Sequence, residues 1–372
     1  MWMGPVRLTV AAQQLGLGIE ATRSLPTLDL RQRGTEFLGL PANRILNSPE
    51  ATGMPFWTIN PYVGCEFGCC YCYARATHGW TAERHGRAHA DRPAREQFER
   101  EIYVKRNAGH VLKQTLEPAR VGNRKILIGS ATDPYQPAER RFGVTRSILE
   151  GLLEFRGLSL GIITKSPLVA RDAELLKALA NRHRLTVQIS LISLDATLIR
   201  RLEPKTPLPH ARLRAVTALA EAGVNVGLII APIVPGLTDG WGSLGGLMAA
   251  GKEAGARHAD GFALRLKPVA RSGFLPVLAQ AYPDLVGRYQ RRYGHRHSAG
   301  PDYLAALDRR IRTLQQIHGF PIRPLDRGDG SSVSETPPPP INVLPELALD
   351  AATGPLAHHT STPSPGVVAC RT

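Results

Sequence analysis

Residues 60–75 read Asn-Pro-Tyr-Val-Gly-Cys-Glu-Phe-Gly-Cys-Cys-Tyr-Cys-Tyr-Ala-Arg, and this stretch decides the fold. Within it, Cys65, Cys69 and Cys72 follow the spacing C-x3-C-x2-C. That spacing is compact enough for one loop to direct three thiolates at a single inorganic centre. A structural zinc site or a ferredoxin-type cluster normally takes four protein ligands. Three cysteines would therefore leave one iron of a four-iron cluster open to a substrate or cofactor.

A further cysteine, Cys70, lies inside the same motif. Adjacent residues rarely both reach one cluster, so we interpret Cys70 as a non-ligand. Two alternatives remain open for the motif, a zinc knuckle and an electron-transfer cluster. The zinc alternative needs His78 or His85 as fourth ligand, and neither lies at the spacing of a zinc finger or ribbon.

The composition sets limits on the class of protein. A chain of 372 residues can form one large or two ordinary domains with a substantial core. No run of ~18 apolar residues occurs, so no membrane span is expected, and the first residues do not resemble a secretion signal. Four of the five cysteines lie between positions 65 and 72, which indicates a reducing cytoplasm with thiols kept for metal. The fifth, Cys370, reads as an incidental exposed thiol.

The net charge of +15 is unevenly distributed. Residues 327–372 carry two arginines and four acids, so the rest of the chain has a net charge of +17. Two basic runs stand out, Arg84, Arg87, Arg92, Arg95, Arg100, Lys105 and Arg106 in the first, and Arg288, Arg291, Arg292, His295, Arg296 and His297 in the second. The electrostatic field of this positive charge favours a polyanionic partner such as nucleic acid. The alternative is the solvated helix faces of an arginine-rich protein.

Strand-like and helix-like segments alternate through the middle of the chain. Short apolar, β-branched runs predict strands at 57–60, 126–129, 158–164, 185–192, 225–231 and 262–266. Helical patterns fill the gaps at about 95–117, 143–156, 168–181, 208–222, 240–254 and 301–317. Six strands alternating with helices predict an α/β fold with a parallel sheet and right-handed crossovers. In such folds the chemistry lies at the carboxyl ends of the strands.

Composition also suggests the domain boundaries. We expect an irregular N-terminal extension over residues 1–50, a core over 51–270 and a helical C-terminal region on the substrate side over 271–327. Residues 328–372 are rich in Pro, Ser, Thr and Ala, cannot bury enough apolar surface to offset chain entropy, and are expected to be disordered.

The cysteine motif, with aromatic Tyr71 directly before its last cysteine, resembles that of the radical S-adenosylmethionine (SAM) superfamily. The resemblance covers residues 55–270 and implies a partial (β/α)6 TIM-like barrel. It implies that Cys65, Cys69 and Cys72 hold a [4Fe–4S] cluster whose fourth iron is chelated by SAM. One electron from the reduced cluster then cleaves SAM to methionine and a 5′-deoxyadenosyl radical. The resemblance also implies an electron donor such as flavodoxin or ferredoxin.

Four polar residues match family positions that contact SAM. Thr132 and Asp133, after the second predicted strand, match the segment that meets the methionine ammonium. Lys165, after the third strand, offers an ammonium to the methionine carboxylate, and Ser190, on the fourth, resembles the ribose contact. These residues can also have purely structural roles. Asp133 can cap an Asp-Pro turn. Lys165 can be an ordinary surface lysine, and the Ser190 hydroxyl can form a hydrogen bond with neighbouring backbone.

The amino-acid sequence of residues 60–75 and of the strand ends resembles that of the spore photoproduct lyase-like branch, and within this branch that of an uncharacterised bacterial group. The lyase carries a hydrogen-donating cysteine three residues before the aspartate after strand two, and here that position is Ser130. Because an O–H bond is too strong to quench a carbon radical easily, lesion-lyase chemistry is in doubt. We therefore expect a radical SAM enzyme with an unknown substrate, of lyase or transferase class. The alternatives are a DNA-lesion repair lyase and a non-catalytic, metal-bound nucleic-acid-binding module.

Overall fold

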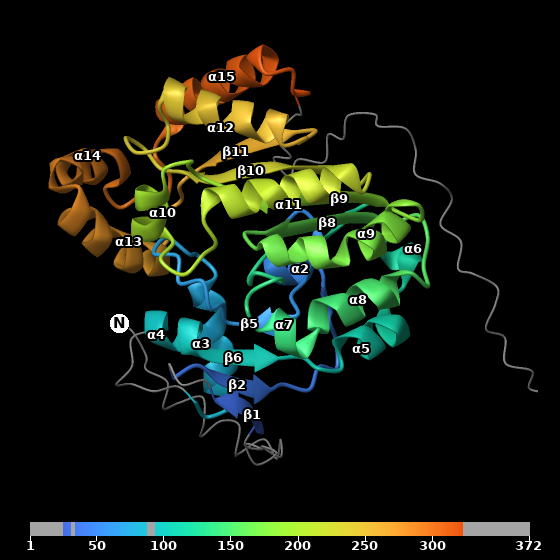
Figure 1. The fold of residues 1–372 in the computed structure, drawn as a ribbon. Coiled ribbons are helices and arrows are strands. Elements are labelled where there is room, and N and C mark those ends of the chain that lie inside the picture. Colours follow the sequence, from blue (N-terminus) through green and yellow to red (C-terminus); the bar gives the residue numbers. More distant parts are fainter. Residues whose placement is uncertain (1–24, 31–33, 88–93, 323–372) are drawn as a thin grey trace, which may run out of the picture.

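The computed structural model describes residues 25–30, 34–87 and 94–322 (Figure 1). The tail predicted at 328–372, with Cys370, lies outside the described residues, as do residues 1–24. Within the described ranges the chain forms two sheets, one of seven strands and one of four.

The seven-stranded sheet has the order β11-β10-β9-β8-β7-β4-β3. Its strands are β3 (Leu46–Asn47), β4 (Trp57–Ile59), β7 (Lys125–Ile128), β8 (Ser159–Thr164), β9 (Arg184–Ser190), β10 (Val226–Ile233) and β11 (Ala259–Ala263). Every pairing from β4 to β11 is parallel, and only β3 runs antiparallel to its neighbour. The order has two ends, so the sheet is a partial barrel. The predicted α/β fold with six parallel strands is confirmed.

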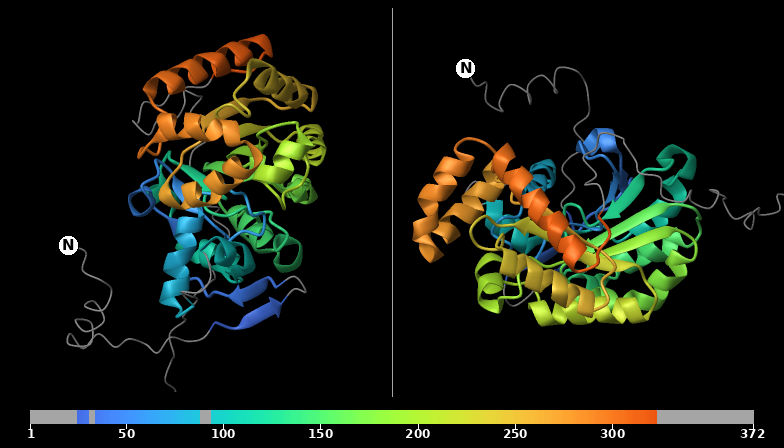
Figure 2. Two further views of the ribbon diagram at one scale, coloured as in Figure 1. Left: turned by 90° about the vertical axis from the view of Figure 1, so that its left-hand side faces the viewer. Right: turned by 90° about the horizontal axis from the view of Figure 1, so that it is seen from above.

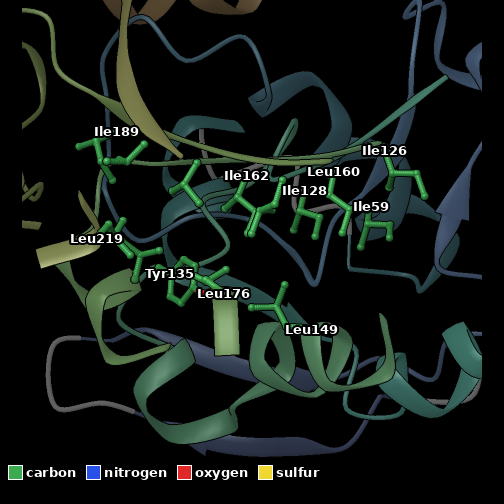
Figure 3. Packing of buried hydrophobic residues seen from close by; sticks show 14 of the residues in the cluster. Ile59, Ile126, Ile128, Tyr135, Leu149, Leu160, Ile162, Leu176, Ile189 and Leu219 are labelled. Carbon is green, nitrogen blue, oxygen red and sulfur yellow. The ribbon is translucent and has the colours of Figure 1, made fainter. Parts of the chain in front are cut away.

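Helices follow the parallel strands as crossovers and cover the sheet. They are α7 (Glu139–Phe142), α8 (Val144–Leu152), the 3-10 helix η1 (Pro167–Asp172), α9 (Ala173–Ala180), α10 (Ala196–Leu202), α11 (Pro209–Glu221) and α12 (Trp241–Glu253). Isoleucines and leucines of β4, β7 and β8 face Leu149 of α8, Leu176 of α9 and Tyr135 across one buried core (Figure 3). Full burial of each such aliphatic side chain stabilises the fold by roughly 1.5–3 kcal/mol, so this layer fixes the strand ends that carry the site.

The smaller sheet lies beneath the start of the cysteine loop and has the order β1-β2-β6-β5 (Figure 1). Its strands are β1 (Thr27–Leu30), β2 (Glu36–Gly39), β5 (Tyr62–Val63) and β6 (Glu101–Val104). Two predictions need correction here. The helix expected at 95–117 is divided by β6 into α4 (Ala94–Arg100) and α5 (Ala108–Thr115), because the buried β-prone run Ile102-Tyr103-Val104 pairs with β2 and β5. Residues 25–50, expected to be irregular, contribute β1, β2, β3 and the short helix α2 (Pro49–Thr52).

As far as residue 322, the region after the barrel contains three helices. It comprises α13 (Pro268–Ala281), α14 (Pro283–Tyr293) and α15 (Pro301–Ile317), with α15 against α12 and β11. Helix α13 contacts α14, α10 and α3 (Arg75–Arg84), so α13 and α14 stand together at one side of the molecule (Figures 1 and 2). The strand predicted at 262–266 is displaced to β11 (Ala259–Ala263) because Leu264 and Leu266 are buried in the connection that follows. The remaining helix is α6 (Pro118–Val121). Among the described helices, none has both the length and the apolar character needed to cross a bilayer.

Two glycines on helices test the packing account. A Cβ at Gly109 of α5 would lie 2.5 Å from the backbone oxygen of Ser147 on α8, whereas a Cβ at Gly246 of α12 would meet nothing within 4 Å. Gly109→Ala is expected to destabilise the fold by about 1–3 kcal/mol by forcing the two helices apart. Gly246→Ala is expected to stabilise it by about 0.5–1 kcal/mol through helix propensity. Urea unfolding of both variants measures the difference, and equal stabilities would contradict the packing account.

Candidate metal and cofactor site

All of the predicted site residues lie at one edge of the large sheet. The register pairs Ile59 with Ile128, Ile128 with Ile162, and Thr164 with Ile189, so these four strands end together. The cysteine loop follows β4, Thr132 and Asp133 follow β7, Lys165 follows β8, and Ser190 ends β9. This is the carboxyl edge at which parallel α/β sheets bind ligands.

The cysteine loop is held on both sides by backbone contacts. Gly64 turns the chain with φ 91°, and a Cβ there would lie 2.7 Å from the carbonyl oxygen of Glu101 on β6. The Cys65 N–H donates to the Phe98 carbonyl oxygen at 2.9 Å. On the other side the Cys70 N–H donates to the Leu202 carbonyl oxygen at 2.9 Å, at the end of α10. The loop is thereby fixed between the small sheet and the later half of the barrel.

Cys70 is the most deeply buried of the four cysteines of the loop. It is fully buried, whereas Cys65 and Cys72 are partly exposed. A Cβ on Gly273 of α13 would lie 2.4 Å from the Cys70 carbonyl oxygen, so α13 packs directly against the loop at this residue. Its interpretation as a non-ligand remains a prediction.

Thr132 and Gln136 attach the segment after β7 to the cysteine loop. The Thr132 hydroxyl donates to the Gly64 carbonyl oxygen at 2.6 Å. The Gln136 amide donates to the same carbonyl at 3.2 Å and to the Thr132 hydroxyl at 2.9 Å. It also accepts from the Glu66 N–H at 3.0 Å, and the Glu66 carboxylate accepts from the Ala138 N–H at 2.8 Å. The sequence signalled Thr132 but gave no reason to select Gln136, which is fully buried.

Asp133 joins the ends of β7 and β8. Its Oδ1 accepts from the Tyr135 N–H at 2.9 Å and the Thr164 hydroxyl at 2.6 Å, and its Oδ2 accepts from the Lys165 N–H at 2.7 Å. Burial raises the pKa of Asp133, and these hydrogen bonds and the charge of Lys165 oppose the rise. A carboxylate has about four acceptor positions, so one of them, on Oδ2, is left for a ligand.

Lys165 and Ser190 contact each other and reach a buried carboxylate that the sequence gave no reason to select. The Lys165 ammonium donates to the Ser190 hydroxyl at 2.6 Å and forms an ion pair of 3.4 Å with Glu203. The Ser190 hydroxyl in turn lies 3.4 Å from the Ala231 carbonyl oxygen. Lys165 is thus a positioned, partly buried cation rather than a surface lysine.

Glu203 is the centre of this buried network. It is fully buried, pairs with the fully buried Arg212 and accepts a hydrogen bond from the Tyr71 hydroxyl. Thr206 donates to it at 3.1 Å. Desolvation opposes its charged form, but the charges of Lys165 and Arg212 with the hydrogen bonds outweigh burial and lower the pKa of Glu203 to about 2. Through Tyr71, the aromatic residue before Cys72, this network is attached to the cysteine loop.

The three thiols lie in one electrostatic environment. Burial raises the pKa of Cys65, Cys69 and Cys72 above the usual range, and thiolate character at one raises the pKa of another. Backbone hydrogen bonds from Phe67 and Asp133 to Cys65 act in the opposite direction. Arg75 and backbone hydrogen bonds do the same for Cys72. Metal ligation requires thiolates. Arg75 and the backbone hydrogen bonds favour the thiolate forms of Cys65 and Cys72.

Arg75 supplies a further test of whether a cluster fits. It is almost fully buried, and its Nη2 donates to the Cys69 carbonyl oxygen at 2.5 Å and to Glu99 at 3.0 Å. Its Nε and Nη1 are buried and have no hydrogen-bond partner among the residues that the structure describes. Unsatisfied buried donors call for an acceptor, and an anionic sulfide cluster on the adjacent cysteines provides one. The donor set therefore fits a three-cysteine iron–sulfur cluster.

The zinc alternative requires a histidine as fourth ligand. Within the ranges the structure describes, no group of three or more His, Cys, Asp or Glu side chains is close enough to hold one metal ion. The ligands of a four-iron cluster lie farther apart than those of one ion. His78, a fourth ligand in the zinc alternative, instead places Nε2 2.9 Å from the Glu101 carbonyl oxygen and packs against Phe98 and Tyr103. Burial lowers the pKa of His78 and of His85, the other zinc candidate.

Comparison with known proteins agrees with this geometry. The sequence model of the radical SAM superfamily matches residues 59–241. The uncharacterized protein Rv2578c of Mycobacterium tuberculosis is 34% identical over 289 residues, which is 76% of this chain and 82% of that protein. The uncharacterized protein MJ0683 of Methanocaldococcus jannaschii is 30% identical over 208 residues, 55% of this chain and 70% of that protein. The chain belongs to the radical SAM superfamily.

Solved structures of spore photoproduct lyase have a similar fold. Spore photoproduct lyase complexed with dinucleoside spore photoproduct superposes with a TM-score of 0.53 at 18% identity, over 84% of this chain and 92% of the lyase. A lyase mutant with bound AdoMet and the same photoproduct gives a TM-score of 0.51, also at 18% identity, over 84% and 91%. At this identity the likeness establishes a shared fold, which is the fold of the lyase-like branch.

The low pKa of Glu203 predicts an acid-dependent loss of stability. Because the pKa of Glu203 in the folded protein, about 2, lies below its ordinary value of 4.5, its contribution to stability is complete above pH 4.5 and is lost as the pH falls toward 2. Glu203→Gln is expected to cost about 3–5 kcal/mol at neutral pH by leaving Lys165 and Arg212 without a counter-charge. The difference from the parent protein should shrink by roughly 3 kcal/mol on acidification.

Denaturant unfolding between neutral pH and pH 2 measures this difference. Glu253→Gln on the exposed face of α12 is the control, expected to stay within about 0.5 kcal/mol of the parent. A constant difference between Glu203→Gln and the parent at every pH would contradict the assigned pKa.

Proposed function

We propose that this protein is a radical SAM enzyme. A [4Fe–4S] cluster bound by Cys65, Cys69 and Cys72 would supply the electron that cleaves SAM to methionine and a 5′-deoxyadenosyl radical. The observation that carries the proposal is the grouping of three thiols on one fixed loop, beside Asp133 and Lys165, at the carboxyl edge of a partial barrel. The superfamily match supports it.

Asp133 and Lys165 offer opposite charges to the two ends of an amino-acid group. The free acceptor position on Asp133 Oδ2 suits the methionine ammonium, and a cation there would offset the desolvation that raises the pKa of Asp133. The Lys165 ammonium has three donors, of which Ser190 and Glu203 use two. The third suits the methionine carboxylate.

Ser190 and Thr132 have different tasks in this proposal. The Ser190 hydroxyl donates only over a long 3.4 Å contact to Ala231 and is available to a ribose hydroxyl. The Thr132 hydroxyl donates to Gly64 and accepts from Gln136, so its main task is to hold the cysteine loop in place. Tyr71 and Glu203 keep Lys165 oriented toward the loop.

The substrate reaction is expected to differ from thymine-dimer repair. Ser130 stands where the lyase carries its hydrogen-donating cysteine, and its hydroxyl accepts from the Asn60 amide at 3.1 Å. A serine cannot readily return a hydrogen atom to a carbon radical. A lesion lyase of the spore photoproduct type stays the alternative, supported by the shared fold. We further propose a cytoplasmic location and a reduced flavodoxin or ferredoxin as electron donor.

Reductive cleavage of SAM tests the proposal. The full-length protein, reconstituted anaerobically with iron and sulfide and reduced with dithionite, should form 5′-deoxyadenosine from SAM, measured by liquid chromatography. Cys69→Ala should abolish the product, because the cluster loses a ligand. Cys70→Ala is the matched control and should keep it. Iron-loaded protein that forms no 5′-deoxyadenosine, or equal loss in both variants, would contradict the proposal.

A second proposal concerns nucleic acid as partner, and the surface of α14 favours it. Arg288, Arg291 and Arg292 are exposed, and none forms an ion pair with a carboxylate in the described part of the chain. Arg292 lies 4.3 Å from the ring centroid of Tyr303. Helix α14 packs on α13, which contacts the cysteine loop. A phosphate backbone bound there would lie near the site.

Charge reversal on α14 tests this partner. Arg288→Glu with Arg291→Glu should weaken binding of a DNA duplex and reduce the slope of log K against log salt by about 2. Arg214→Glu with Arg309→Glu makes the same change of charge at exposed positions on α11 and α15 and is the control. Equal effects of the two pairs would show a general charge effect and contradict a nucleic-acid surface on α14.

A further inference from the structure

Lys105 is an ammonium at the site edge to which no described carboxylate supplies a counter-charge. It follows β6 directly, and its Nζ donates to the backbone carbonyl oxygen of Asn60 at 2.9 Å. No carboxylate in the described residues lies within ion-pair distance of it. Lys165 and Lys205, by contrast, pair with Glu203 and Glu99.

The surroundings of Lys105 make an unpaired charge unfavourable. Burial lowers the pKa of Lys105 to about 8, and no neighbouring charge contributes to the shift. The side chain is nevertheless partly open to solvent. A cation that is surrounded by protein, reachable from outside and unpaired is stabilised when an anion binds to it.

Lys105 is connected to Ser130 through a single residue. The Asn60 side chain donates to the Ser130 hydroxyl at 3.1 Å and accepts from the Ala131 N–H at 2.8 Å, while the Asn60 carbonyl holds Lys105. The hydroxyl of Tyr73, which is 47% exposed, donates to the Ser130 carbonyl oxygen. Lys105 and Ser130 therefore both contact Asn60, at the carboxyl ends of β4, β6 and β7, and Tyr73 contacts Ser130.

The contacts of this group are separate from those of the residues assigned to SAM. Asp133, Lys165 and Ser190 form one network at the ends of β7, β8 and β9. Lys105 takes part in none of those contacts. An anion at Lys105 would thus belong to a second ligand. That ligand would lie next to Ser130, the position of the hydrogen-donating cysteine in the lyase.

We propose that Lys105 and Ser130 form a binding subsite for an oxyanion, a carboxylate or phosphate group, of the substrate. Lys105 has two unused N–H donors. The Ser130 proton has only a 3.5 Å contact with Asn60 Oδ1 and is free to donate. A serine here orients an anionic substrate by a hydrogen bond, where a cysteine would return a hydrogen atom. This inference rests on the proposed function, because it takes Asp133 and Lys165 to be occupied by SAM.

Competitive labelling of lysines tests the subsite. The reconstituted full-length protein, with SAM bound, is acetylated briefly at constant ionic strength with increasing inorganic phosphate in one series and succinate in another. Peptide mass spectrometry follows Lys105 and, as control, exposed Lys125 at the opposite end of β7. Only the free amine reacts, so Lys105 labelling should fall about tenfold at an anion concentration near ten times its Kd. The more protective series identifies the group as phosphate or carboxylate.

A pair of variants adds an independent readout. Ser130→Ala should require a several-fold higher anion concentration for the same protection, whereas Ser272→Ala on the exposed face of α13 should not change it. Labelling of Lys105 that falls no more than that of Lys125 in both series would overturn the subsite. Protection by SAM alone would also overturn it, since Lys105 would then serve the cofactor. SAM cleavage by the same preparation is scored separately, so failure of the subsite is distinguishable from failure of the proposed function.

Discussion

A buried carboxylate must be neutralised by its surroundings, and in this protein that requirement organises the site. Glu203 is fully buried and takes its counter-charges from Arg212 on α11 and Lys165 after β8. It also accepts from the hydroxyl of Tyr71 in the cysteine loop. One carboxylate thus joins the loop to the end of β8 and to helix α11. Removing one partner would leave an uncompensated charge in the interior, so the parts of the site cannot shift independently.

A second set of contacts holds the opposite side of the loop. The carbonyl oxygen of Gly64 accepts from both Thr132 and Gln136 after β7. Between these two attachments the thiols of Cys65, Cys69 and Cys72 form no disulfide, and backbone N–H groups favour the thiolate forms of Cys65 and Cys72. The backbone of the loop is held by these hydrogen bonds, and its sulfur atoms are left to bind a metal. A loop with a fixed backbone and unpaired thiols is better suited to binding a cofactor than to packing in the core.

The sequence predicted the parts of this arrangement that depend on local pattern. Apolar runs marked the six parallel strands, and polar residues at their ends marked Thr132, Asp133, Lys165 and Ser190, which the structure brings into one hydrogen-bonded edge. It did not predict partners that depend on tertiary contact. Glu203 lies between the predicted strand at 185–192 and the predicted helix at 208–222, where no pattern selects it, and Lys105 is one residue of the first basic run. Only the fold brings each of them against the site. Strand β6 was missed because it takes its pairing from β2, far away in the sequence.

The central claim is that three cysteines hold a cluster whose open iron binds SAM. Iron counting and electron paramagnetic resonance of the anaerobically reconstituted, reduced protein, before and after SAM is added, test it most directly. We expect about four irons per chain and a cluster signal that changes when SAM binds. A protein that holds one zinc or iron, or a four-iron signal that SAM leaves unchanged, would contradict the account.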